Sequence, residues 1–133
     1  MSELVCIDTN VLIRFLRADH PQLSPKAREI FAKAQKGEIK IYLDEIIVAE
    51  AIWLLSSFYK VKKADIAFQL QELISQEWIV NPRKKLILDS LSLYSTSSLH
   101  YIDCWAICVS QSVKSELKTF DKKLTRLAFG SKG

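Results

Sequence analysis

The stretch Leu4-Val5-Cys6-Ile7-Asp8-Thr9-Asn10-Val11 opens the chain with an apolar run that ends in an acid. Four consecutive apolar residues predict a strand over residues 4–7, buried beneath other layers on both faces. The residues from Val11 to Leu16 predict a helix. Asp8 therefore lies where a strand gives way to a helix, and open α/β sheets build their sites at such strand ends.

The rest of the chain continues this alternation. We expect further strands at residues 39–43, 78–80 and 117–120, and helices at residues 25–36, 45–59, 64–76, 83–94, 103–113 and 122–129. Ser24 and Pro25 mark the start of one helix and Gly37 its end, and Asp44 can cap the next. Strands that alternate with helices predict the α/β class, with helices on both faces of a parallel sheet of about four strands.

Length and composition restrict the chain to one domain. It has 133 residues, of which 49% are hydrophobic, with three Gly and three Pro. This indicates a single compact domain over residues 1–133. The N-terminus lacks a basic region, and no apolar stretch approaches the length of a membrane span. We therefore expect a protein that is neither exported nor embedded in a membrane.

The cysteines and histidines give no sign of a soft metal site. Cys6, Cys104 and Cys108 are odd in number and have apolar neighbours, which argues against a disulfide framework and favours the cytoplasm. Two thiols without a nearby histidine are more often core residues than metal ligands. His20 and His100 have no nucleophile at a suggestive spacing.

The charge balance is mildly basic. Lys and Arg number 19 against 15 Asp and Glu, which leaves a net charge of +4. If several acids gather in one cleft, the remaining surface is more basic than this figure and suits a polyanion, although solubilising lysines explain it equally well. The candidate phosphate contacts are Arg14, Arg17, Lys60, Lys62, Lys63, Arg83, Lys84, Lys85, Lys122 and Lys123.

Glu50 occupies an unexpected position inside an apolar helical segment. Its neighbours three and four residues away are Ile46, Ile47, Trp53 and Leu54. The pattern predicts that the carboxylate faces the interior. Burial without a partner is costly, so a cation, a hydrogen-bond network or a proton is needed there.

Two further acids occur at the ends of expected elements. Asp121 follows the expected strand at residues 117–120, and Asp103 begins a helix. Parallel strands bring their carboxyl ends to one edge, so both acids can approach Asp8 and Glu50. Thr119 would lie on the same strand face as Asp121 and offer a hydroxyl.

Four neighbouring carboxylates repel one another unless a divalent cation lies among them. Ligands that are all oxygens select Mg²⁺ or Mn²⁺. Such a cluster is suited to in-line hydrolysis of a phosphodiester. Asn10 adds an amide that can bond a metal-bound water or a phosphate.

Other interpretations stay open. Asp8, Asp103 and Asp121 can each be plain helix caps. A phosphohydrolase or phosphoryl-transfer domain that uses Asp8 as a nucleophile also places an acid at a strand end. It would have a second carboxylate where Asn10 stands, or a dedicated lysine opposite Asp8.

The chain resembles PIN domains through four motifs in the right order. They are Ile7-Asp8-Thr9-Asn10, Val48-Ala49-Glu50, Tyr101-Ile102-Asp103-Cys104-Trp105-Ala106 and Lys118-Thr119-Phe120-Asp121-Lys122-Lys123-Leu124. The resemblance implies a three-layer α/β/α sandwich. A free-standing domain of this size is similar to the VapC-type toxins of prokaryotic toxin–antitoxin pairs.

That resemblance implies an endoribonuclease that depends on Mg²⁺ or Mn²⁺, is inhibited by a cognate antitoxin and is commonly a homodimer. It would make Asp8, Glu50, Asp103 and Asp121 the metal-binding acids, with Asn10 and Thr119 as supporting polar groups. The alternative is a catalytically silent PIN module that binds RNA or a protein partner. Retention of all four acids speaks against this alternative.

The C-terminus departs from the family pattern. Family members usually continue past the fourth acid into another helix and a fifth, edge strand, whereas residues 122–133 alone follow Asp121. We therefore expect the fifth strand to be missing, which affects how the sheet edge is covered and whether the usual dimer contacts form.

Overall fold

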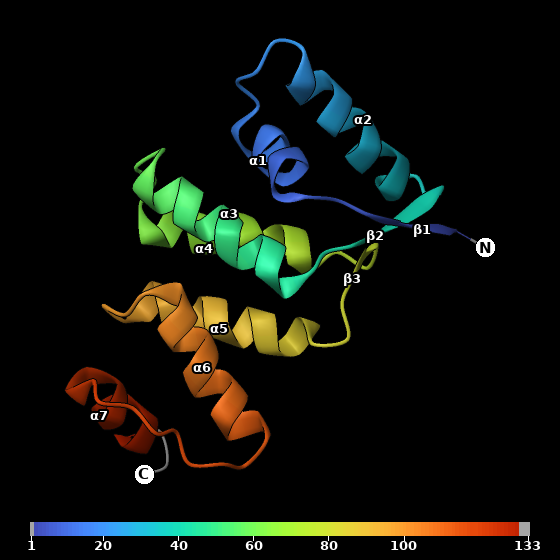
Figure 1. Cartoon of the computed structure of the whole chain (residues 1–133). Helices are drawn as coiled ribbons and strands as arrows, with labels where there is room; N and C mark the ends of the chain where they lie inside the picture. Colours follow the sequence, from blue (N-terminus) through green and yellow to red (C-terminus); the bar gives the residue numbers. More distant parts are fainter. Residues whose placement is uncertain (1, 131–133) are drawn as a thin grey trace. The chain divides into compact units, whose positions relative to one another are not determined.

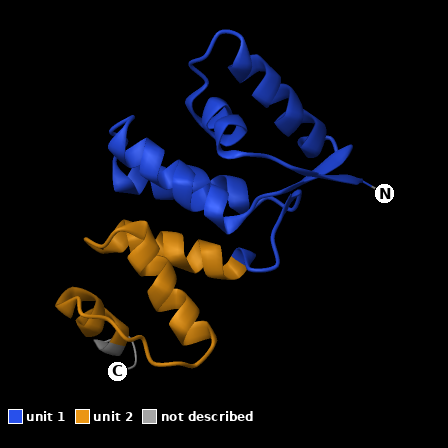
Figure 2. Ribbon diagram, viewed as in Figure 1, with its two compact units in different colours: residues 1–84 blue, residues 85–133 orange. Residues whose placement is uncertain are grey.

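The structure is a computed structural model that describes residues 2–130, with side chains as far as residue 128. It divides into two compact units, residues 1–84 and 85–133, and each unit is described by itself (Figure 2). Whether the chain forms a single domain over residues 1–133 stays a prediction.

The first unit contains a parallel sheet with helical connections (Figure 1). Its elements are β1 (Glu3–Cys6), α1 (Thr9–Arg17), α2 (Leu23–Gln35), β2 (Ile39–Tyr42), α3 (Glu45–Ser57), α4 (Lys63–Ile74) and β3 (Ile79–Val80). The strand order is β1-β2-β3, with Val5 opposite Ile41 and Ile41 opposite Ile79. Helix α1 packs on α2 and α3, and α4 packs on α3 and β3. The expected α/β class is therefore confirmed.

Strand β1 differs from the expectation of a strand buried on both faces. Leu4 and Cys6 are exposed, and full burial begins only at Ile7, after the strand. Within residues 2–130, β1 pairs with β2 alone and so forms an edge of the sheet. An apolar run predicts the strand correctly, but it does not determine how many neighbours cover it.

The expected strand at residues 117–120 is wrong, because this segment has no regular secondary structure. Its backbone groups form no strand pairing with the sheet that the structure describes, and Phe120 is fully exposed. The sheet over residues 2–130 accordingly has three strands instead of about four. The expectation of a missing fifth strand extends over residues 131–133, which lie outside the described residues.

The expected capping signals hold at α3 but not at α2. Asp44 caps α3 as expected, because its Oδ1 accepts from the Ile46 N–H at 2.8 Å. Helix α2 begins before the expected Ser24-Pro25 signal, and His20 Nδ1 accepts from the Leu23 N–H at 2.9 Å. Ser24 is instead buried and donates its hydroxyl hydrogen bond to the Arg14 carbonyl at 2.8 Å.

The second unit is helical. It consists of α5 (Lys84–Thr96, whose first residue belongs to the first unit), α6 (Tyr101–Ser112) and α7 (Lys122–Gly130). Tyr94 and Tyr101 meet edge to face at 5.9 Å between ring centroids. Cys104 and Cys108 are buried, as expected for core thiols. No helix within residues 2–130 is long and apolar enough to cross a membrane.

Candidate active site

Asp8 lies between β1 and α1 and serves as the N-cap of the helix. Its Oδ1 accepts from the Val11 N–H at 3.0 Å, so the capping interpretation is correct for this oxygen. The carboxylate is exposed, and Oδ2 has no hydrogen-bond partner among the described residues. The cap therefore orients Asp8 while one oxygen remains open to a ligand.

Glu50 is exposed, and the expectation that it faces the interior is wrong. Ile46 is 74% exposed and Trp53 is 64% exposed, one turn or so to either side of Glu50. Helix α3 is apolar on nearly all sides, so its sequence pattern does not distinguish the buried face. That face is formed by Val48, Ala51, Ile52 and Leu55. The costly burial inferred for Glu50 does not occur.

Asn10 and Glu50 line the same pocket in the first unit, which has a volume of about 290 Å³. Asn10 lies in the first turn of α1, directly after Thr9, and Glu50 projects from α3. The packing of α1 on α3 brings the amide and the carboxylate together. A solvent-accessible pocket that contains an amide and a carboxylate therefore adjoins the position of Asp8.

In the second unit, Asp103 lies in the first turn of α6 and is half-buried. His100 occupies the N-cap position of this helix, and within residues 2–130 no side chain caps it. The plain-cap interpretation of Asp103 is therefore wrong. Its carboxylate is available for another role.

Asp121 immediately precedes α7 and caps it. Its Oδ1 accepts from the Lys123 N–H at 2.8 Å and the Leu124 N–H at 3.3 Å. Thr119 Oγ1 accepts from the Asp121 N–H at 3.1 Å. Thr119 and Asp121 do not share a strand face as expected, because no strand forms there. Thr119 instead supports Asp121 through this local bond.

The candidate residues are thus divided between the units. Asp8, Asn10 and Glu50 belong to the first unit, and Asp103, Thr119 and Asp121 to the second. Within residues 2–130, no group of three or more His, Cys, Asp or Glu side chains is close enough to hold one metal ion. In the same range, none of the four acids forms an ion pair with Lys or Arg. Their chemistry fits a hard cation, because unpaired carboxylates are its preferred ligands.

Several of the basic residues expected to contact phosphate bond their own chain instead. The pairs are Arg83 with Glu45 at 3.4 Å, Lys84 with the Gln76 carbonyl at 2.7 Å, Lys85 with Asp89 at 3.0 Å and Lys123 with Ser98 at 2.8 Å. Burial also lowers the pKa of Lys84. Arg14, by contrast, lines the pocket that contains Glu50.

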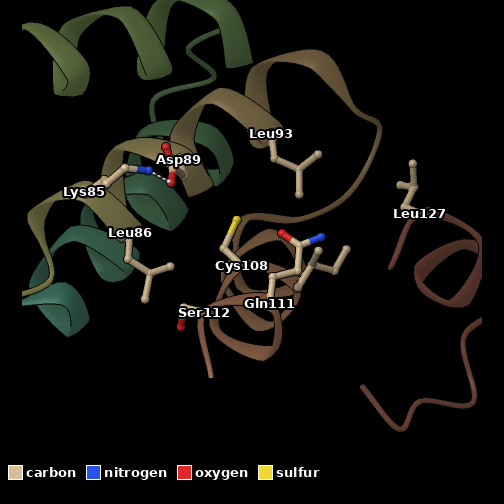
Figure 3. A pocket seen from close by; sticks show the side chains of 9 residues that line it. Lys85, Leu86, Asp89, Leu93, Cys108, Gln111, Ser112 and Leu127 are labelled. Carbon is tan, nitrogen blue, oxygen red and sulfur yellow. Dashed lines mark hydrogen bonds and ion pairs between the residues drawn. The ribbon is translucent and has the colours of Figure 1, made fainter. Parts of the chain in front are cut away.

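A separate cavity of about 450 Å³ in the second unit contains none of the four candidate acids (Figure 3). Leu86 and Leu93 of α5, Ile107 of α6 and Leu127 of α7 contribute to its walls. Burial raises the pKa of the Cys108 thiol at this cavity. A protonated, buried thiol is a poor nucleophile, so this cavity carries no evident catalytic chemistry.

Among the residues of the Glu50 pocket that the sequence did not assign to a site are Thr9, Phe58 and Tyr59. Thr9 separates Asp8 from Asn10, and the two aromatic residues end the helical segment that carries Glu50. Their closeness in sequence to Asp8, Asn10 and the helix of Glu50 is the signal that could have identified them as pocket residues.

A family model of the PIN domain matches residues 5–130. The chain therefore belongs to the PIN domain family, which confirms the resemblance seen in its four acidic motifs. It is similar to a VapC ribonuclease of Aquifex aeolicus (strain VF5), with 24% identity over 124 residues, which cover 92% of this chain and 91% of that protein. No solved structure matches the chain.

Proposed function

We propose that the protein is a metal-dependent endoribonuclease and the toxin of a type II toxin–antitoxin pair. The observation that carries this proposal is Glu50, an unpaired and exposed carboxylate in the same pocket as Asn10, next to the strand end that bears Asp8. Membership of the PIN domain family and the similarity to a VapC ribonuclease support it.

In this proposal Asp8, Glu50, Asp103 and Asp121 hold Mg²⁺ or Mn²⁺. The bound ion would supply a water of lowered pKa and neutralise charge on the phosphate oxygens. Backbone N–H groups at the starts of α1 and α7 fix the orientation of Asp8 and Asp121 through one oxygen each. Asn10 and Thr119 act as supporting polar groups, Thr119 by its bond to the Asp121 backbone.

The proposed partners are suggested by the similarity to a VapC ribonuclease. We propose an RNA substrate, a cognate antitoxin that inhibits the enzyme, and a homodimer in the cytoplasm. The three free cysteines are compatible with a reducing compartment.

The test is cleavage of a folded RNA by the purified protein. We expect cleavage with Mg²⁺ or Mn²⁺ and none after chelation with EDTA. Asp8→Asn, Glu50→Gln, Asp103→Asn and Asp121→Asn should each lower the rate by about 100-fold or more. Asp19→Asn is the control, because Asp19 is an exposed acid outside the candidate set.

Full activity in EDTA would exclude the metal-dependent mechanism. RNA binding without cleavage in either metal would instead favour a catalytically silent PIN module.

A further inference from the structure

The pocket beside Glu50 has an aromatic wall that catalysis by the four acids does not require. Phe58 and Tyr59 line it, and their rings meet edge to face at 4.9 Å between centroids. The N–H groups of both residues donate to the Leu54 carbonyl, at 2.9 and 3.0 Å. These bonds fix the backbone from which the two rings project, and Phe58 is 71% exposed.

Two polar groups at the same pocket have no hydrogen-bond partner among the described residues. Thr9 is only 6% exposed, and its Oγ1 is buried without a partner. The Nε of Arg14 is also buried and without a partner. Burying such groups unsatisfied costs free energy, and both residues line this pocket.

The chemistry of the pocket matches a planar, polar and aromatic ligand. An open phenylalanine ring offers a stacking face, and Arg14, Thr9 and Asn10 offer hydrogen bonds at the edge. The Arg17 guanidinium lies over the Tyr59 ring, 4.9 Å from its centroid, and adds positive charge next to this ring. RNA-binding proteins recognise unstacked bases with this combination of aromatic stacking and edge contacts.

We propose that this pocket binds one unpaired nucleobase of the RNA, next to the phosphate that is cleaved. The inference rests on the proposed function for the identity of the polymer. A base within a duplex is stacked on both faces and cannot present one to Phe58. The pocket therefore restricts cleavage to unpaired nucleotides, such as those in loops.

The test measures RNA binding separately from cleavage. Single-stranded RNA oligonucleotides, each with an abasic nucleotide at a different position, are titrated onto the Asp8→Asn protein with Mn²⁺. We expect one abasic position to weaken binding about fivefold or more. Adding Phe58→Ala should weaken binding of the intact RNA similarly and abolish the sensitivity at that position.

Phe68→Ala is the matched control. Phe68 is also an exposed phenylalanine, 64% accessible, but it lies on α4 and lines a different cavity. Its removal should leave the affinity and the abasic profile unchanged. Thr9→Val, which removes the hydroxyl at nearly constant volume, should lower affinity for the intact RNA more than for the abasic RNA.

The inference would be overturned if no abasic position weakened RNA binding. It would also be overturned if an abasic position weakened binding equally with and without Phe58. If Phe58→Ala then weakened antitoxin binding, the pocket would be assigned to the protein partner. The two proposals fail separately. If the abasic effect depends on Phe58 but no RNA is cleaved in Mg²⁺ or Mn²⁺, the nuclease proposal alone is overturned. If RNA is cleaved but the abasic effect does not depend on Phe58, the base-pocket proposal alone is overturned.

Discussion

Asn10, in the first turn of α1, and Glu50, in the middle of α3, line one pocket. The two residues are distant in sequence, and the packing of α1 on α3 is what joins them. Asp8 caps the same helix that carries Asn10, so the N-terminus of α1 brings an acid and an amide close to the pocket that contains Glu50.

The exposure of Glu50 predicts that its role in activity can be separated from any role in stability. Glu50→Gln should abolish RNA cleavage and change the free energy of unfolding by no more than about 0.5 kcal/mol, because no buried interaction is lost. Urea unfolding measures the second quantity. Glu72→Gln, at another exposed helical glutamate, is the control and should keep its activity. A large loss of stability for Glu50→Gln would mean that the carboxylate is structural.

Asp8 combines capping with its proposed metal contact, and two substitutions separate these roles. Asp8→Asn should retain the stability of the parent, since asparagine is an equally good N-cap, whereas Asp8→Ala should lose about 1 kcal/mol. Both variants should be inactive on RNA. Chemical denaturation and a cleavage assay on the same preparations would show the difference. Equal stability of the two variants would contradict the capping role.

Asn81 connects the ends of two strands to the start of α3. Its Nδ2 donates to the Leu43 carbonyl at 2.8 Å and to Glu45 Oε1 at 3.0 Å, and its Oδ1 accepts from the Arg83 N–H at 2.7 Å. Because Asn81 is buried, Asn81→Ala should destabilise the fold by about 1–3 kcal/mol. Thermal and urea unfolding measure this loss.

The same residue predicts a change in pH dependence. The Asn81 hydrogen bond is the largest cause that holds the pKa of Glu45 below its ordinary value of 4.5, with Arg83 adding to the effect. A lowered folded pKa stabilises the protein above the unfolded pKa, and this contribution is lost as the pH falls through the folded pKa. Asn81→Ala should therefore lose less stability than the parent on acidification from about pH 7 to about pH 3.

Glu45→Gln is the control for this effect. Glu45→Gln removes the titrating group. Adding Asn81→Ala to this variant should therefore cause no further change in how its stability depends on pH. Additional flattening in the double variant would show that another group titrates with Asn81.

Expression in a bacterial host tests the toxin role. The parent should slow growth unless a cognate antitoxin is supplied, and Asp8→Asn should be harmless at the same expression level. Asp19→Asn should be as toxic as the parent. Equal toxicity of Asp8→Asn and the parent would trace the harm to something other than metal-dependent hydrolysis.

The sequence predicted element types better than their surroundings. The helices and the first three strands follow from apolar periodicity and from caps such as Asp44. A local pattern does not show which other elements a segment packs against. For this reason the predicted burial of β1 on both faces is wrong, because β1 is an edge strand, and so is the predicted strand at residues 117–120, where no strand pairing forms.

The acidic motifs identify the candidate residues, but the predicted burial of Glu50 is wrong. The neighbours of Glu50 in α3 suggested burial, but an almost wholly apolar helix must expose one of its apolar faces, and that face carries Ile46, Glu50 and Trp53. The aromatic wall at Phe58 and Tyr59 was not recognised because it depends on the packing of α1 beside the end of α3.

The central proposal is that Asp8, Glu50, Asp103 and Asp121 hold a divalent ion. Titration of the protein with Mn²⁺, followed by electron paramagnetic resonance of the free ion, tests it without RNA. The account predicts that Glu50→Gln in the first unit and Asp103→Asn in the second each weaken Mn²⁺ binding by about tenfold or more, and that the double variant loses less than the sum of the two effects. Unchanged Mn²⁺ binding in either single variant would contradict a shared metal site.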